Sequence, residues 1–298
     1  MNIERLLKDF KNYKINIEGK TSSTVDWYIQ KINSFCDDMK ISTYEQLIST
    51  SADCVQDWLS ILADNGNGET TRNNKLSAIK ELFKYLRKQR KEKIDIDILD
   101  IPNAKAPYKE TKYASRDIIM QMLEVITNQR VRAGVAVIME EGLRFSEMMQ
   151  ITCTGIMRGE QTIVGKGRKE RTIYFSPFCI NICREFINGK RKQIVERTGV
   201  DTDLLFISDE GTLLTRQSFS ASLKLYAEKI GLYWYNEMSP HKLRHGAITN
   251  MLNEGVPIQT VRDVAGHSSI NTTNRYAHAD EEDVKKAMLH IYNKNEDD

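Results

Sequence analysis

The sequence is poor in proline, with five among 298 residues, and it shows no internal repeat or low-complexity tract. Scarce proline favours a helix-rich chain without long disordered segments. The chain also lacks an apolar run of about 18 residues, the length that a membrane-spanning helix needs. Its N-terminus has no apolar segment of the secretory type. We therefore expect a soluble protein of the cytoplasm.

Cysteine is equally scarce, and its spacing matches no zinc motif. Cys179 and Cys183 lie four residues apart, but no second pair accompanies them. Buried, reduced thiols are the ordinary state of such residues inside a cell. We expect no metal site. The full set is Cys36, Cys54, Cys153, Cys179 and Cys183.

Charge of one sign is nearly absent from two short segments, although the formal net charge is only +2. Residues 71–91 contain eight basic residues and one acid, and residues 166–171 contain four basic residues and one acid. Local stripes of positive charge matter more for contacting phosphates than the net charge does. Both segments are candidates for an anionic partner.

Apolar residues at helical spacing predict three helices in the first hundred residues. One stripe spans 25–36, with Ser22 or Ser23 as its cap, a second spans 55–62, and a third spans 76–86. The third helix would have an apolar face toward its own domain and a basic face toward an anionic partner, although a solvated charged face is the common alternative. The basic candidates are Arg72, Lys75, Lys80, Lys84, Arg87 and Lys88.

Two prolines, Pro102 and Pro107, flank a polar stretch that predicts an interdomain linker over 105–112. We expect a helical domain over 1–104 and a second domain over 113–298. In the second domain, β-forming residues on both sides of a Gly-containing basic loop predict a β-hairpin within 161–175. Helical patterns occupy most of the rest, so the predicted class is mainly α with a small β-sheet.

Six polar residues of the second domain are candidates for chemistry. Each alone has an ordinary explanation, such as a helix-end arginine, a turn lysine, a structural histidine or a core tyrosine. His241 and His245, four residues apart, fit a structural role as well. The candidates are Arg144, Lys166, His241, Arg244, His267 and Tyr276.

Together with their flanks, these residues resemble the tyrosine recombinase (phage integrase) family. Residues 141–147 (Glu-Gly-Leu-Arg-Phe-Ser-Glu) resemble its first arginine motif, and residues 165–171 (Gly-Lys-Gly-Arg-Lys-Glu-Arg) resemble its hairpin lysine motif. Residues 241–245 match its His-x-x-Arg box, and residues 266–278 match its nucleophile block. The order of the motifs is the family's order, and the resemblance covers nearly the whole chain.

The resemblance implies a role for each residue, and the roles make chemical sense. Tyr276 would attack a DNA phosphate and hold it covalently. Arg144 and Arg244 would clamp the non-bridging oxygens, with a further hydrogen bond from His267. His241 would assist proton transfer at the tyrosine, and Lys166 would protonate the leaving 5′-oxygen.

Glu147 would orient nearby polar groups without touching DNA. Two departures from the family pattern bear on geometry only: 21 residues separate Arg144 from Lys166, fewer than in many relatives, and Val264-Ala265 replaces paired leucines.

Competing motifs fail on inspection. Lys166 is not in a phosphate-binding loop, because Gly167 follows it where Ser or Thr is needed. His241 and His245 have zincin spacing, but Lys242 occupies the place of the glutamate. No carboxylate cluster suggests a two-metal nuclease. We expect neither cofactor nor metal, since a phosphotyrosine conserves the bond energy.

The implied architecture is a C-shaped clamp on double-stranded DNA. A SAM-like core-binding domain would grip one side, and the catalytic domain would contact phosphates through Arg168, Lys169 and Arg171. Four protomers, monomeric in solution, would assemble on two recombination sites, joined by a C-terminal exchange helix. We expect no further arm-binding domain before the first helix, which favours a Xer-like or simple integrase or resolvase role. An accessory or directionality factor is a further candidate partner.

Two rival functions stay open. One is strand resealing of the type IB topoisomerase kind, which shares the chemistry, and the other is a catalytically silent DNA-binding protein on the same fold. Holliday-junction products would separate recombination from simple relaxation.

Overall fold

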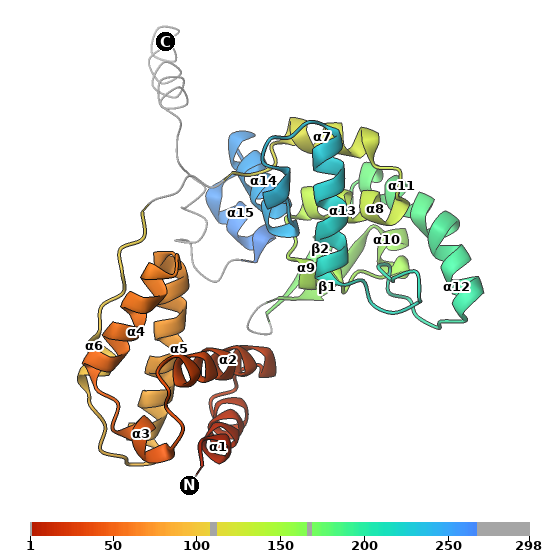
Figure 1. Ribbon diagram of the computed structural model, residues 1–298. Coiled ribbons are helices and arrows are strands. Elements are labelled where there is room, and N and C mark those ends of the chain that lie inside the picture. The colour runs from red at the N-terminus through yellow and green to blue at the C-terminus, as the bar shows by residue number, and fades with distance from the viewer. Residues whose placement is uncertain (1, 108–111, 166–168, 267–298) are drawn as a thin grey trace, which may run out of the picture. The chain divides into compact units, whose positions relative to one another are not determined.

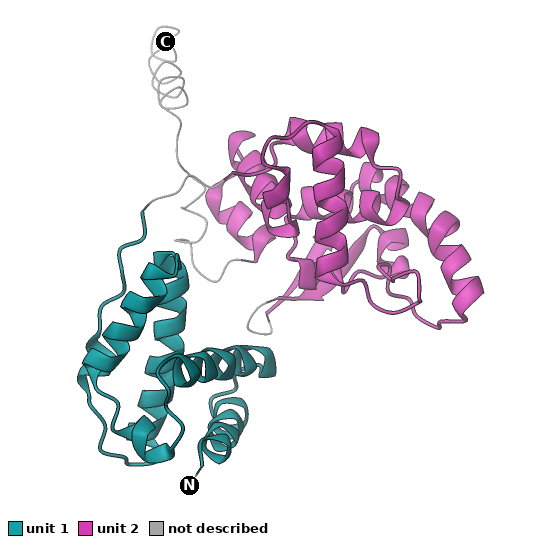
Figure 2. Ribbon diagram, viewed as in Figure 1, with its two compact units in different colours: residues 1–110 teal, residues 111–298 magenta. Residues whose placement is uncertain are grey.

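The computed structural model describes residues 2–107, 112–165 and 169–266. The chain divides into two compact units, residues 1–110 and residues 111–298 (Figure 2). Each unit has its own apolar core. The mainly helical class with one small antiparallel sheet is confirmed (Figure 1).

The first unit is built of helices around a core that includes Phe35, Trp58 and Phe83. Thr21 caps the second helix by accepting from the backbone N–H of Thr24, so the expected Ser22 or Ser23 cap was wrong by one or two residues. The helices are α1 (Ile3–Asn16), α2 (Ser22–Asp38), α3 (Tyr44–Ile48), α4 (Ala52–Asp64), α5 (Glu69–Lys88) and α6 (Asp97–Asp100).

The segment after α6 is tied back to α5. The side chain of Asn73 both donates to the carbonyl of Ala104 (2.9 Å) and accepts from its N–H (2.8 Å). Lys80 donates to the carbonyl of Ile101 at 2.5 Å. The residues just before the predicted linker are therefore held by side chains of the basic helix.

The second unit surrounds α8, which packs against α11 and α14. Its helices up to the middle of the unit are α7 (Arg116–Val125), α8 (Gln129–Glu141), α9 (Phe145–Met148), α10 (Cys153–Arg158) and α11 (Pro177–Phe186). The remainder are η1 (Ile187–Arg191), α12 (Lys192–Thr198), α13 (Arg216–Lys229), η2 (Tyr235–Glu237), α14 (Pro240–Asn253) and α15 (Ile258–Ala265).

The predicted hairpin consists of β1 (Glu160–Val164) and β2 (Glu170–Tyr174), paired antiparallel. Gln150 extends the pairing on the other edge of β1, because its side-chain amide bonds the N–H and the carbonyl of Val164, both at 2.9 Å. Gln161 donates to the carbonyl of Gln150 at 2.7 Å. The base of the hairpin is thereby fixed to the segment that follows α9.

Helix α14 lies very close to the segment before α7. A Cβ placed on Gly246 would come within 1.7 Å of the carbonyl oxygen of Ala114, so only glycine fits there. The N–H of Ala114 also donates to the carbonyl of Lys242 at 3.4 Å. These contacts fix the helix that bears His241 and Arg244.

Candidate active site

Arg144 lies at a sharp break between two helices. Gly142 ends α8 in the left-handed conformation, with φ +54°, and Arg144 is the residue before α9. Glu147, one turn into α9, accepts the backbone N–H of Arg144 at 2.9 Å and its Nη1 at 2.7 Å. The arginine is therefore held at both its backbone and its guanidinium group.

The Glu147 carboxylate is the centre of a cluster of three arginines. Its side chain is only 2% exposed, and its oxygens lie 2.7 Å from Arg144, 3.0 Å from Arg171 and 3.5 Å from Arg244. Burial alone would raise the pKa of Glu147, but hydrogen bonds from Arg171 and Arg144 outweigh it and lower the pKa. The Glu147 carboxylate thus contacts both arginines of the predicted pair.

Arg244, on α14, is almost fully buried and is held by backbone carbonyls. It donates to the carbonyl of Gly142 at 2.6 Å and to that of Ala265 at 2.7 Å. Arg144 reaches the same end of α15, with Nη1 3.4 Å from the Ala265 carbonyl and Nη2 3.3 Å from that of Gly266. Two arginines far apart in the sequence therefore converge at the C-terminus of α15.

His241 lies one turn before Arg244 on α14. Desolvation by the atoms packed around its ring lowers the pKa, and the charges of Arg244, Arg216, Lys242 and Arg144 lower it further, although the residue keeps an exposed edge. A neutral imidazole is the form that can accept a proton.

His245 has a different environment, and the alternative of a structural histidine fits it. Its ring stacks on Tyr113 with the centroids 5.4 Å apart, and Nδ1 lies 3.3 Å from the hydroxyl of Thr249. Desolvation and the neighbouring His241 lower the pKa of His245 to about 4.

Arg171 lies in a different place from the one that the sequence suggested. We expected it on the DNA-contacting hairpin surface, but its side chain is 14% exposed and pairs with Glu147. The signal was available: along β2, Arg171 alternates onto the same face as buried Ile173. Lys169, by contrast, is exposed at the end of the hairpin.

The basic side chains of α5 fall into two groups. Lys84, Arg87 and Lys88 are exposed, with Lys84 3.0 Å from Glu81. Arg72, Lys75 and Lys80 are half-buried and have partners within their own unit. These partners are the Glu69 carboxylate for Arg72, the Trp58 ring for Lys75 and the Ile101 carbonyl for Lys80.

Four candidates lie outside the described residues: Lys166, Arg168, His267 and Tyr276. The segment 280–298, which holds the expected exchange helix, lies outside them too. In the described part of the chain, no group of three or more His, Cys, Asp or Glu could hold a metal ion. No helix in that part is long and apolar enough to cross a membrane.

The cluster of arginines around Glu147 suits an anion whose oxygen atoms point in more than one direction. Three guanidinium groups surround one carboxylate, so positive charge is in excess. Arginine forks match phosphate geometry and stabilise charge that develops on phosphoryl oxygens. His241 lies one helical turn before Arg244 on α14. These features define a phosphoryl-transfer site on a helical two-unit protein.

Comparison with known proteins gives the family. Residues 113–283 match the model of the Phage integrase family, and residues 7–90 match the Phage integrase N-terminal SAM-like domain. The chain belongs to the phage integrase family of tyrosine recombinases. It is therefore a DNA strand transferase of the site-specific recombinase class, and recombination is favoured over topoisomerase-like resealing.

The similarity to relatives named as tyrosine recombinases extends over most of the length of each relative. The tyrosine recombinase XerD of Vibrio vulnificus is 30% identical over 239 residues, covering 78% of this chain and 77% of the relative. XerC of Roseiflexus is 27% identical over 269 residues, covering 86% and 83%. The crystal structure of the XerH recombinase bound to its difH substrate shares the fold, with a TM-score of 0.73, 22% identity and 96% and 83% coverage.

Proposed function

We propose that Tyr276 is the nucleophile of this recombinase and that Arg144 and Arg244 stabilise the phosphoryl group it attacks. The observation that carries the proposal is the convergence of both arginines on the Ala265 carbonyl, at 3.4 and 2.7 Å. The matched nucleophile block begins directly after this point, with Gly266 and His267. The arginines are thus attached to the start of the segment that carries the tyrosine.

The proposed step forms one bond and breaks one. The phenolic oxygen of Tyr276 bonds to phosphorus, its proton passes to neutral His241, and the bond from phosphorus to the 5′-oxygen breaks. Lys166 supplies the proton to that leaving oxygen, and His267 donates to a non-bridging oxygen. A phenol with a pKa of about 10 also leaves readily in the return step, which rejoins the strand.

The test is trapping of the covalent intermediate on a suicide substrate. Tyr276→Phe removes only the hydroxyl, so it should abolish the protein–DNA adduct while DNA binding stays near that of the wild type. Substitution of a tyrosine outside the motif, Tyr233→Phe on the exposed surface, is the matched control and should leave the adduct unchanged. An adduct formed by Tyr276→Phe would show that another residue attacks.

The proposed substrate is a double-stranded recombination site contacted by two domains, 1–104 and 113–298, joined by the linker 105–112. The exposed cations of α5 and the hairpin residues Lys166, Arg168 and Lys169 would contact phosphates. Arg72, Lys75 and Lys80 would support this surface from within their unit. The setting would be the cytoplasm, at the nucleoid, with an accessory or directionality factor as a possible partner.

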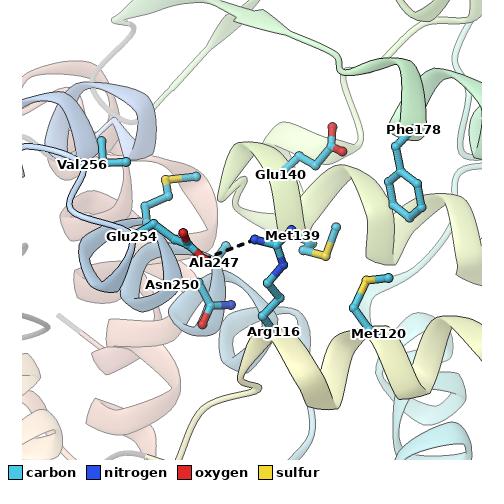
Figure 3. Close-up of a pocket in the computed structure, with 10 residues that line it drawn as sticks. Arg116, Met120, Met139, Glu140, Phe178, Ala247, Asn250, Glu254 and Val256 are labelled. Carbon is cyan, nitrogen blue, oxygen red and sulfur yellow. Dashed lines mark hydrogen bonds and ion pairs between the residues drawn. The ribbon is translucent and has the colours of Figure 1, made fainter.

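The proposed assembly is a homotetramer on DNA formed from monomers, and an apolar pocket on the second unit supports it. The pocket has a volume of about 530 Å³ and is lined by α7, α8, α11 and α14. Met120 and Phe178 on its wall are 39% and 41% exposed, and the Arg116–Glu254 ion pair (3.3 Å) lies at its side (Figure 3). Large apolar side chains left exposed in one patch suit a protein partner.

The occupant that fits this pocket is the C-terminal segment of a neighbouring protomer. In that segment Val284, Ala287, Met288, Ile291 and Tyr292 recur at helical spacing after an acidic start. An amphipathic helix laid into an apolar groove is a common mode of recognition. Passing the segment to a neighbour would also link the position of Tyr276 to assembly.

Two variants test the assembly. Truncation before Asp280 should leave a protein that binds a half-site but forms no synapse. Phe178→Glu should do the same, whereas Leu225→Glu, at an exposed leucine of α13 (49%), should not. Normal synapsis by the truncated protein, or by Phe178→Glu, would exclude this exchange. Native gels with paired half-sites measure it.

A further inference from the structure

Arg171 touches two glycines that precede two proposed catalytic residues. A Cβ on Gly266 would come within 2.6 Å of Arg171 Nη1 and 3.0 Å of its Cζ. A Cβ on Gly165 would lie 3.3 Å from the same Nη1. Gly165 directly precedes Lys166 in the sequence, and Gly266 directly precedes His267. One guanidinium group is therefore packed against the starting points of both segments.

The same guanidinium group is fixed by the carboxylate that holds the arginine pair. Arg171 Nη2 lies 3.0 Å from Glu147 Oε2, and Nη1 lies 3.3 Å from Oε1, an almost bidentate contact. Glu147 bonds Arg144 through both the backbone and the side chain. Arg171 thus joins the hairpin strand β2, helix α9 and the end of α15.

The close approach depends on the two glycines. Gly266 has φ +62°, a conformation that other residues rarely adopt, and its missing side chain leaves the space that the guanidinium group fills. The N–H of Gly165 donates to the carbonyl of Lys169 at 2.7 Å, closing the hairpin beside Arg171. Any larger residue at position 266 would displace the arginine or the chain.

We infer that Arg171 is a positioning residue, which fixes Gly165 and Gly266, the residues directly before Lys166 and His267, relative to the arginine clamp. It does so by packing against Gly165 and Gly266 while its charge is held by Glu147. The inference rests on the proposed roles of Lys166 and His267. It assigns to Arg171 a role inside the site in place of a phosphate contact on the DNA surface.

The first test compares two suicide substrates in single-turnover cleavage at saturating protein, one with oxygen and one with sulfur at the 5′-bridging position. Sulfur leaves without a proton, so a misplaced acid matters little there. Arg171→Lys and Arg171→Gln should cleave the oxygen substrate about tenfold or more slowly, a typical cost of misplacement. The part of that loss that comes from a misplaced Lys166 should return on sulfur, as for Lys166→Ala, whereas any part that comes from a misplaced His267 should remain. Arg184→Gln, at an exposed arginine of α11, is the matched control.

The second test addresses Gly266 by a double-variant comparison. Gly266→Ala should slow cleavage because its new methyl group collides with Arg171. Arg171→Gln shortens the side chain, so the combined variant should lose clearly less than the product of the two single losses. The strain at φ +62° is present in both backgrounds and cancels. Losses that multiply would show that this contact does not position the segment.

Three outcomes separate the possibilities. Weakened DNA binding with normal cleavage at saturation would make Arg171 a phosphate anchor and overturn the inference. Equal slowing on oxygen and sulfur, while Lys166→Ala recovers on sulfur, would overturn the positioning of Lys166 by Arg171. If Lys166→Ala itself fails to recover, the proposed acid is wrong, and the Gly266 comparison still decides the role of Arg171. Thermal unfolding of Arg171→Lys, which keeps the charge, checks that the variants are folded.

Discussion

Glu147 and Arg144 hold each other at two points: the carboxylate accepts the backbone N–H of Arg144 at 2.9 Å and its guanidinium Nη1 at 2.7 Å. The break after α8 and the direction of the arginine side chain are thus fixed by one residue. Because Glu147 also contacts Arg171 and Arg244, changes at this carboxylate should be felt by the whole cluster.

Glu147→Gln should therefore reduce both stability and cleavage. Removing the charge leaves three buried or half-buried arginines poorly compensated, which typically costs about 3 kcal/mol of unfolding free energy.

The lowered pKa of Glu147 means that its contribution to stability is present above the ordinary carboxyl pKa and is lost as the pH falls through the pKa of the folded state. Denaturant unfolding from neutral to acidic pH should show a flatter acid limb for the variant. Glu196→Gln, exposed on α12, is the control; identical acid limbs for Glu147→Gln and wild type would refute the assignment.

Arg144→Ala and Arg244→Ala should each slow single-turnover cleavage at saturating protein by about a hundredfold, the scale of losing one oxyanion donor. They should differ in stability. Arg244 is 3% exposed and satisfies two carbonyls, whereas the Arg144 side chain is 31% exposed. Arg244→Ala removes the bond to the Gly142 carbonyl and the shorter of two bonds to the buried Ala265 carbonyl, so it should lower the melting temperature by several degrees, and by more than Arg144→Ala.

The control for both is Arg132→Ala, at a surface ion pair with Glu185. If the losses of Arg144→Ala and Arg244→Ala are confined to affinity, both arginines are phosphate anchors and not part of the clamp.

Charge reversal on α5 should separate the exposed from the half-buried cations. Arg87→Glu with Lys88→Glu should weaken DNA binding and flatten its dependence on salt, because fewer counterions are released. Lys80→Met should mainly destabilise the first unit, since its ammonium bonds the Ile101 carbonyl. Binding titrations over a range of salt concentrations give the slope. If the double variant Arg87→Glu with Lys88→Glu has the same salt dependence of DNA binding as the wild type, this face of α5 is solvated and does not contact DNA.

The pH dependence of cleavage should follow His241. The pKa of His241 lies below the usual 6.5, so its ring should still be neutral when the pH drops through that value. The cleavage rate should therefore stay constant through pH 6.5 and decrease only at a lower pH. Arg216 is one of the charges that lower this pKa, and it is exposed at the start of α13. Arg216→Gln should raise the pKa and move the acid limb to higher pH, while Arg184→Gln should not. A limb that stays in place would mean that another group controls the rate.

The sequence alone predicted helices α2, α4 and α5, the hairpin and the reaction, but not the short helices α3 and α6 or the first helix α1. Helical spacing of apolar residues is a local property, as is the β-forming composition on both sides of a Gly-containing loop, so both can be read without tertiary contacts. The four ordered motifs identified the chemistry for the same reason, because each motif is a short contiguous segment. The cap at Thr21 shows the limit, since neighbouring hydroxyl residues compete for one position.

Only the tertiary structure decided which cations turn inward. Arg171 and Lys169 belong to the same basic loop motif, yet one is 14% exposed and pairs with Glu147 while the other is exposed. A charge can be buried only where an oppositely charged or hydrogen-bonding partner is held ready, and the partner of Arg171 lies on α9, outside the motif. In the same way, the carbonyl of Ile101 makes Lys80 a structural residue of its unit. Whether each of these cations is buried or exposed depends on which distant segments the fold brings together, and a local sequence pattern does not contain that information.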